Sequence, residues 1–197
     1  MTSANTRARV VDAAIVAFGS RGYDATSLDA LAGELGIRKQ TILYYCPSKE
    51  ALLDAAIDRA AAELSAVLEE SLDGAGNGWG RVEAVVRSVF RLAARRPELL
   101  GLLREVSRLG PPAATRLTTA LGPLIGRAAL FLEGEMEAGA MRRHDPKLLL
   151  LAAYSAVIGV ATEVEVMRAL GYEPNGRSLV RRRRELLSFL RSALVPG

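Results

Sequence analysis

The sequence contains few cysteine, histidine and aromatic residues. Among its 197 residues there are one cysteine, Cys46, and one histidine, His144, and aromatic residues make up 5%. One cysteine excludes an internal disulfide framework, and these two residues leave little material for a Cys/His metal site. Few aromatic residues give a β-sheet few places to form, whereas helix-forming Ala, Leu, Arg and Glu are abundant. We therefore expect an all-α fold with no metal and no cofactor.

Long apolar runs are also missing. The longest, LLLLAAYSAVIGVA at residues 148–161, is too short to span a bilayer, and the start MTSANTRARV has no apolar signal core. We therefore expect a cytoplasmic protein with no membrane partner. The net charge of +4 and the pI near 9.6 are compatible with an anionic partner, but equally with an ordinary protein surface.

Helix start and stop signals are dense in the first quarter of the chain. Thr6 can cap a first helix, and Gly22 stands where a left-handed residue would end it. Thr26 and Asp29 have the spacing of a capping box for a second, short helix. Gly36 is placed to end that helix. The pattern predicts two helices joined by a short turn.

A third helix is predicted from about Arg38, because Ile37 and Ile42 have the spacing of a hydrophobic staple. Pro47 cannot easily continue it, and Ser48 can cap a long fourth helix. Two short helices with a glycine-containing turn, braced by a preceding helix, describe the helix-turn-helix.

The rest of the chain also has helical periodicity. The stretch DGAGNGWG at residues 73–80 is the clearest loop. Beyond it we predict helices near residues 79–95, 97–108, 112–138, 145–170 and 178–194. No internal repeat, low-complexity tract or flexible linker interrupts them.

The third predicted helix has a polar side. Ile42 and Cys46 can face inward, which leaves five outer side chains suited to DNA: Arg38, Lys39, Gln40, Thr41 and Tyr44. Arg and Lys can donate to guanine, Gln can pair with adenine, and hydroxyl groups can hold phosphates. The helix starts at Thr26–Ser27 and Ser48–Lys49 offer free backbone N–H groups to phosphate oxygens. Spacing alone fits a solvated helix face equally well.

Several short motifs fall in register between residues 7 and 53. They are the Ala-x-x-x-Phe of Ala14–Phe18, Gly22–Tyr23 followed by Thr26, Ala32 four residues before Gly36, and Tyr45 before Pro47-Ser48-Lys49-Glu50. With these motifs, the segment resembles the N-terminal DNA-binding region of the TetR family of bacterial repressors. The resemblance covers about a quarter of the chain.

The resemblance implies an all-α homodimer with two functional parts. Residues 1–47 would form a helix-turn-helix DNA-binding domain and residues 48–197 an effector-binding and dimerisation domain. It assigns base reading to Arg38, Lys39, Gln40 and Tyr44, and phosphate anchoring to Thr26, Ser27, Thr41, Tyr45 and Lys49. The implied partners are a palindromic double-stranded operator and a small-molecule effector.

Three positions depart from the pattern common in the family. Leu43 stands where many members have a tyrosine that touches the DNA backbone, so Tyr44 or Tyr45 would take that role. Cys46 replaces the usual phenylalanine, and we expect it to act as a smaller apolar anchor, with a redox-sensing thiol as the alternative. Arg38 stands where a serine-like cap is common, which exchanges local capping for a possible guanine contact.

The last two predicted helices suggest a dimer interface. Residues 145–170 are apolar around most of the helix, more than one buried stripe requires, and residues 178–194 add further leucines. We expect both helices to pair with their symmetry mates, and the alternative is an unusually buried monomer core. Arg181–Arg184 point around the whole helix, so we expect them to form ion pairs, with Glu163, Glu165 or Glu185 as partners. His144 is expected in a turn before the first of these helices, although a metal or effector contact is an alternative.

An effector pocket is expected among the helices from Lys49 to Ala138, and it would favour a hydrophobic or amphipathic molecule. Five residues could form apolar walls or equally the core: Trp79, Phe90, Leu103, Phe131 and Met136. An enzyme is disfavoured because paired carboxylates, a phosphate-binding glycine motif and further histidines are missing. The sequence thus predicts a DNA-binding transcriptional regulator, a repressor released by its effector. The alternative is a non-enzymatic helical protein that binds small molecules or lipids.

Overall fold

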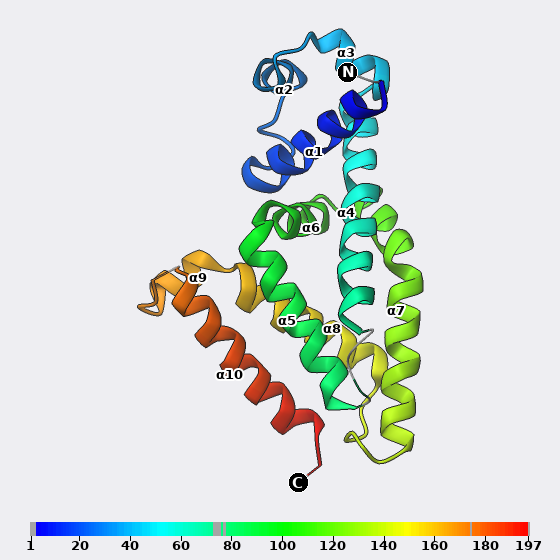
Figure 1. The fold of residues 1–197 in the computed structure, drawn as a ribbon, viewed down its shortest axis with the longest axis vertical. Helices are drawn as coiled ribbons and strands as arrows, with labels where there is room; N and C mark the ends of the chain where they lie inside the picture. Colours follow the sequence, from blue (N-terminus) through cyan, green and yellow to red (C-terminus); the bar gives the residue numbers. More distant parts are fainter. Residues whose placement is uncertain (1–2, 73–75, 77, 174, 197) are drawn as a thin grey trace. The chain divides into compact units, whose positions relative to one another are not determined.

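The computed structural model describes residues 3–72, 76, 78–173 and 175–196, and within them every regular element is an α-helix (Figure 1). The helices are α1 (Ser3–Arg21), α2 (Leu28–Leu35), α3 (Lys39–Tyr45), α4 (Lys49–Leu72), α5 (Trp79–Arg95), α6 (Pro97–Leu109), α7 (Ala113–Glu137), α8 (Pro146–Thr162), α9 (Val164–Ala169) and α10 (Gly176–Leu194). The expected all-α fold is confirmed. Of the predicted loop at residues 73–80, positions 73–75 and 77 lie outside the described residues.

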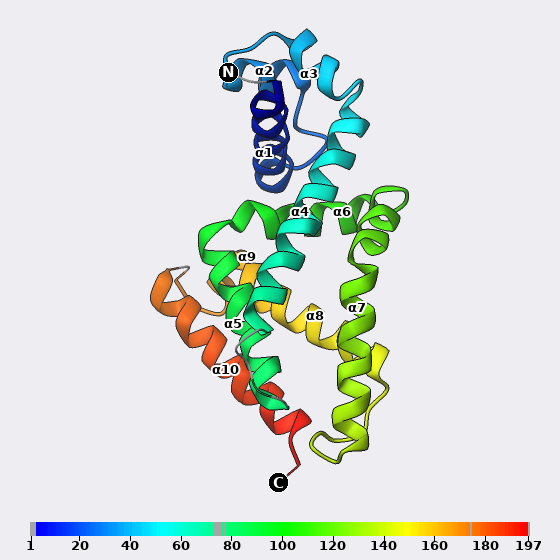
Figure 2. The ribbon, with the colours of Figure 1, turned by 45° about the vertical axis from the view of Figure 1, so that its right-hand side comes forward.

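The chain forms two compact units, and the first comprises Met1–Leu64 and Arg96–Leu121. In this unit α1 contacts α2, α3 and α6, and α2 contacts α3 (Figures 1 and 2). Its core is made of large apolar side chains with almost no exposure: Val10, Ile15, Phe18, Leu31, Ile42, Leu52, Ile57, Leu99, Leu100, Leu102 and Leu103. The helix-turn-helix therefore shares one core with α6.

Polar contacts also join the end of α1 to α6. The backbone N–H of Tyr23 donates to Oε1 of Glu105 at 2.6 Å. Arg108 then bridges Glu105 and Asp24, at 2.8 Å and 3.0 Å. The hydrogen bond from Arg108 lowers the pKa of Glu105, although partial burial opposes this. Glu105 is therefore an ionised acceptor for the chain that leaves α1.

The predicted helix ends are confirmed at the glycines. Gly22 and Gly36 have φ of +90° and +65°, a conformation that L side chains rarely adopt. The predicted cap of α2 is wrong by one residue, because Ser27 accepts from the N–H of Ala30 at 3.1 Å and is the N-cap. Thr26 is buried, and its hydroxyl donates to the carbonyl of Gly22 at 2.8 Å.

The starts of α3 and α4 agree with the predictions. Arg38 is the N-cap of α3 and its side chain makes no capping hydrogen bond, as expected where arginine replaces a serine-like residue. The hydroxyl of Ser48 accepts from the N–H of Ala51 at 3.1 Å and caps α4. The starts of α3 and α4 therefore lie where the sequence predicts them.

The second unit comprises Ser65–Arg95 and Gly122–Gly197. Here α5 and α10 lie side by side and both contact α8 (Figures 1 and 2). Leu186, Leu187 and Leu190 form the buried face of α10. A second apolar cluster joins α7 to the start of α8 through Leu132, Met136 and Met141. His144 lies exposed just before α8, as predicted.

The predicted helix at residues 145–170 is wrong in one respect, because the chain breaks at Glu163 into α8 and α9. The guanidinium of Arg182, on α10, donates to the carbonyl of Val160 in the last turn of α8. A cation is favourable at a helix C-terminus, where carbonyl groups lack their intrahelical partners. Arg182 therefore stabilises the end of α8.

The arginine run on α10 has varied contacts. The prediction of ion pairing is wrong for Arg182, which has the backbone partner described above and a pKa lowered by burial. Arg184 lies 3.4 Å from Glu185, one of the expected partners. Arg181 lies over the ring of Tyr172, 5.3 Å from its centroid. The run is not a single basic strip.

Candidate nucleic-acid interface

Helix α3 presents the polar face that the sequence predicts. Ile42 has no exposed surface and Cys46 is 2% exposed, so these two residues anchor the helix to the core. Gln40 and Tyr44 lie one turn apart on the opposite side, and 80% of Tyr44 is exposed. With this much exposed surface, the Tyr44 side chain is available to another molecule.

The two cations at the start of α3 differ. Lys39 is half-buried and its ammonium group lies 2.8 Å from the carboxylate of Asp29 on α2. Arg38 is exposed and forms no ion pair with any carboxylate in the described part of the chain. Arg38 can therefore bind an anion directly, whereas Lys39 has to leave Asp29 first. The sequence reasoning missed Asp29 because the pair spans the turn between the two helices.

The start of α4 is organised around Tyr23. The hydroxyl of Tyr23 donates to Glu50 at 3.1 Å, and the ammonium group of Lys49 lies 4.1 Å from the centroid of the Tyr23 ring. Burial, together with the Glu50 carboxylate, raises the pKa of Tyr23 to about 12. The pKa of Glu50 is lowered by hydrogen bonds from its own backbone N–H, from Ser48 and from Tyr23. Tyr23 was not among the predicted site residues, although it orients Lys49.

The remaining predicted residues lie near these helix ends. Thr41 and Tyr45 are half-buried on α3, and the Tyr44 and Tyr45 rings pack edge to face with centroids 5.0 Å apart. Ser27 is exposed at the start of α2. Thr26 differs, since it is 3% exposed and both its hydroxyl and its backbone N–H bond to carbonyls of the preceding turn. This geometry favours Ser27 over Thr26 as a phosphate contact.

The predicted effector walls lie in or beside the core. Phe90, Leu103 and Met136 are buried, and Phe131 packs against the cluster around Leu132. Trp79 is half-buried, with the guanidinium of Arg191 6.0 Å from its ring centroid. These contacts fit the core interpretation, and the position of an effector pocket stays a prediction.

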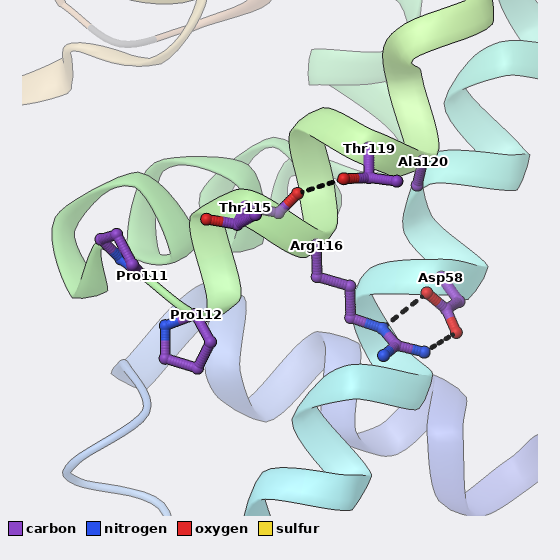
Figure 3. Close-up of a pocket in the computed structure, with 7 residues that line it drawn as sticks. All are labelled: Asp58, Pro111, Pro112, Thr115, Arg116, Thr119 and Ala120. Carbon is purple, nitrogen blue, oxygen red and sulfur yellow. Dashed lines mark hydrogen bonds and ion pairs between the residues drawn. The ribbon is translucent and has the colours of Figure 1, made fainter.

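A surface groove of about 620 Å³ lies elsewhere, in the first unit (Figure 3). It is lined by Asp58, Pro111, Pro112, Thr115, Arg116, Thr119 and Ala120, all of them exposed. Arg116 points at Asp58 across the groove, with N–O distances of 2.8 and 2.5 Å. A groove held by an exposed ion pair does not resemble the apolar pocket that the sequence predicts.

Apolar side chains are exposed on α8 and α10, the two helices of the expected dimer interface. On α8 the exposed fractions are 66% for Leu148, 61% for Leu151 and 46% for Tyr154. Phe189 on α10 is 63% exposed. Such a group of large apolar side chains in contact with water is typical of a protein interface.

Neither a metal cluster nor a membrane span is found over residues 3–72, 76, 78–173 and 175–196. In these ranges no three His, Cys, Asp or Glu side chains are grouped so that they could hold a metal ion. None of the helices there combines the length and apolar character needed to cross a bilayer.

Comparisons with known proteins agree with the helix-turn-helix geometry. Residues 10–56 match the family described as bacterial regulatory proteins, tetR family. The chain is 33% identical over 106 residues to the HTH-type transcriptional repressor DrrR1 of Streptomyces coeruleorubidus, which covers 53% of this chain and 38% of that protein. It is 28% identical over 162 residues to the HTH-type transcriptional regulator RutR of Escherichia coli (strain K12), covering 75% of this chain and 69% of RutR. The chain thus spans well under two thirds of the length of DrrR1.

Solved structures share the fold over nearly the whole chain. A putative transcriptional regulator from Saccharomonospora viridis in complex with choline has a TM-score of 0.81 at 20% identity, over 98% of this chain and 100% of that one. AibR in complex with isovaleryl coenzyme A and operator DNA has a TM-score of 0.77 at 17% identity, over 93% and 96% of the two chains. The helix-turn-helix segment is therefore similar to the tetR family of bacterial regulatory proteins, and the chain as a whole shares the all-α fold of these solved structures.

Proposed function

We propose that this protein is a sequence-specific transcriptional regulator, a repressor, whose α3 binds in the major groove of an operator. The observation that supports this most strongly is the division of α3 into two sides. Ile42 and Cys46 anchor one side, while Arg38, Gln40 and Tyr44 are exposed on the other. A helix of this kind places donors and acceptors against base edges.

The predicted site residues take two roles in this proposal. Arg38, Lys39, Gln40 and Tyr44 read bases, and Ser27, Thr41, Tyr45 and Lys49 hold phosphates, with Thr26 shaping the turn before α2. The N-termini of α2 and α4 add backbone N–H groups that favour phosphate oxygens. Phosphate contacts fix the position of α3, and base contacts supply the sequence preference.

In this proposal, the form that binds the operator is a homodimer of the chain. The exposed apolar side chains of α8 and α10 would pack against their symmetry mates in a homodimer. Two recognition helices related by a two-fold axis would read a palindromic operator, with half-sites about 34–36 Å apart. Residues 1–47 would then carry DNA binding, and residues 48–197 effector binding and dimerisation.

The proposed effector is a hydrophobic or amphipathic small molecule. Structures with this fold include a complex with choline and a complex with isovaleryl coenzyme A. The effector would act by binding more tightly to a dimer whose recognition helices do not match adjacent major grooves, which shifts the population away from DNA. In this account the protein works in the cytoplasm and catalyses no reaction.

The proposal is tested with a labelled random-sequence duplex in a titration repeated at about 50–200 mM salt. A DNA-binding protein should lose affinity steeply over this range, because each phosphate contact releases condensed counterions. Binding that is absent at low salt would contradict the proposal. Parallel titration with lipid vesicles tests the alternative, in which the exposed apolar side chains of α8 bind lipid.

A further inference from the structure

Several cations near the helix-turn-helix are already paired with carboxylates. Arg21 lies 2.8 Å from Glu34. Lys39 lies 2.8 Å from Asp29 as described above, and Arg59 lies 3.6 Å from Asp12. Arg7 and Arg9, in the first part of α1, form no ion pair with any carboxylate in the described residues. Unpaired cations are the ones that bind a phosphate without first breaking a contact.

Arg7 and Arg9 lie on opposite sides of α1. Arg7 precedes the buried residues Val10 and Val11 by three and four positions, so it belongs to the face of α1 that packs into the first unit. Arg9 precedes Val16, which is 48% exposed, by seven positions and shares its outward face. The two arginines are about 200° apart around the helix. Both side chains are exposed, but only Arg7 lies at the margin between core and solvent.

The first part of α1, which includes Arg7, lies beside α3 (Figures 1 and 2). Helix α1 contacts α3, whose C-cap is Cys46. The positive charge of Arg7 lowers the pKa of the Cys46 thiol, against the larger effect of burial, which raises it. This electrostatic effect agrees with the placement of the first part of α1 beside α3.

We propose that Arg7 contacts a DNA phosphate and extends the nucleic-acid interface from α3 and the start of α4 onto α1. This inference rests on the proposed function. The planar guanidinium group offers paired N–H donors to phosphate oxygens, and an exposed, unpaired side chain retains the freedom to reach them. The contact adds affinity without base preference, since phosphates carry no sequence information directly.

The experiment compares three variants of the full chain with the unmodified protein: Arg7→Ala, Arg9→Ala and Arg7→Lys. Each is titrated with the same labelled random-sequence duplex at several salt concentrations, and the slope of log K against log salt is measured. Arg7→Ala should weaken binding at every salt concentration and reduce the slope by about one unit for each phosphate that the protein no longer neutralises. Arg9→Ala removes the same charge from the same helix and should leave the slope unchanged. Arg7→Lys keeps a cation and should restore most of the slope.

The outcomes separate this inference from the proposed function. If the unmodified protein binds DNA with a steep slope and Arg7→Ala keeps that slope, Arg7 is not a phosphate contact. Equal losses of affinity for Arg7→Ala and Arg9→Ala would also overturn the inference, because they would reflect net charge and not position. A chain with no salt-dependent binding refutes the proposed function, and the inference falls with it. Thermal unfolding of each variant within about 2 °C of the unmodified protein confirms that the fold is intact.

Discussion

The backbones of Gly19 and Gly101 touch where α1 crosses α6. A Cβ on Gly101 would lie 2.2 Å from the carbonyl oxygen of Gly19, and a Cβ on Gly19 would lie 1.9 Å from the carbonyl oxygen of Glu98. Only glycine allows the two helices to approach this closely. Together with the bond from Tyr23 to Glu105, this crossing joins the helix-turn-helix to α6 within the first unit.

The close contact between Gly19 and Gly101 predicts that even a small substitution there should destabilise the fold. Gly101→Ala should lower the free energy of unfolding by about 1–3 kcal/mol, because the added methyl group overlaps backbone atoms. The better helix propensity of alanine opposes this by only about 1 kcal/mol. The change is measured by urea-induced unfolding.

Gly33→Ala is the matched control, since Gly33 is exposed within α2 and a Cβ there would meet nothing within 4 Å. It should raise the unfolding free energy by about 0.5–1 kcal/mol. If the two substitutions had the same effect, the crossing would not be tight.

The pair between Lys39 and Asp29 predicts a gain of DNA affinity on substitution. Asp29→Asn frees Lys39 and removes a negative charge beside α3. Because exposed ion pairs contribute about 0.2–1 kcal/mol, we expect affinity to rise up to about fivefold, with a steeper salt dependence. Fluorescence anisotropy with a labelled duplex measures the change.

Glu34→Gln removes the same charge from the same helix, where it is paired with Arg21, and should leave DNA affinity unchanged. Weaker binding by Asp29→Asn would argue that Asp29 orients Lys39 for DNA and does not hold it back.

The exposed face of α3 predicts where base preference is encoded. Gln40→Ala and Tyr44→Ala should each relax selection at the bases they contact, at a cost of about 1–3 kcal/mol per specific contact. Competition between a preferred duplex and its single-base variants measures this change in selectivity. Val16→Ala, on the outward face of α1, should change nothing. If neither α3 substitution altered base preference, the recognition face would be wrongly assigned.

Cys46 should be inert towards alkylation. Its side chain is 2% exposed, and burial raises the pKa of the thiol. Because the pKa of the thiol is higher in the folded than in the unfolded protein, the neutral thiol contributes stability to the fold. This contribution is fully present below the ordinary pKa of the thiol and is lost as the pH rises through the raised pKa. Native protein near pH 8 should react with iodoacetamide far more slowly than urea-unfolded protein. Equal rates in the two states would point to an accessible thiolate and reopen the redox-sensor interpretation.

The exposed apolar side chains of α8 predict that a charged substitution there should dissociate the dimer. Leu151→Glu places a charge on a side chain that is 61% exposed in the single chain, so it should leave folding intact and shift sedimentation towards the monomer. Leu130→Glu changes a residue of similar exposure, 69%, on α7 and should leave the dimer intact. Dimers that survive the first substitution would place the interface elsewhere.

Local signals in the sequence were sufficient for most of the helix-turn-helix. Glycines at Gly22 and Gly36 and the cap at Ser48 act within a few residues, so their spacing predicts the helix ends. The burial of Ile42 and Cys46 follows from the apolar pattern of one short helix. These features could be predicted because the causes and their effects lie close together in the chain.

Features that depend on distant residues were not predicted. The last turn of α8 is bound by Arg182, which reaches the Val160 carbonyl from 22 residues away. Ser27, and not the predicted Thr26, caps α2, because Thr26 is buried, and the sequence does not show this burial. The position of Arg7 relative to α3 likewise depends on packing between helices, which helical periodicity does not encode.

The most direct test of the account is selection of bound sequences from a random duplex pool by the full chain. We expect enrichment of an inverted repeat whose half-sites are centred about 10–10.5 base pairs apart or a multiple of that distance, since two copies of α3 would read the two halves. A pool that remains random after repeated rounds, or that yields a motif without two-fold symmetry, would contradict the account.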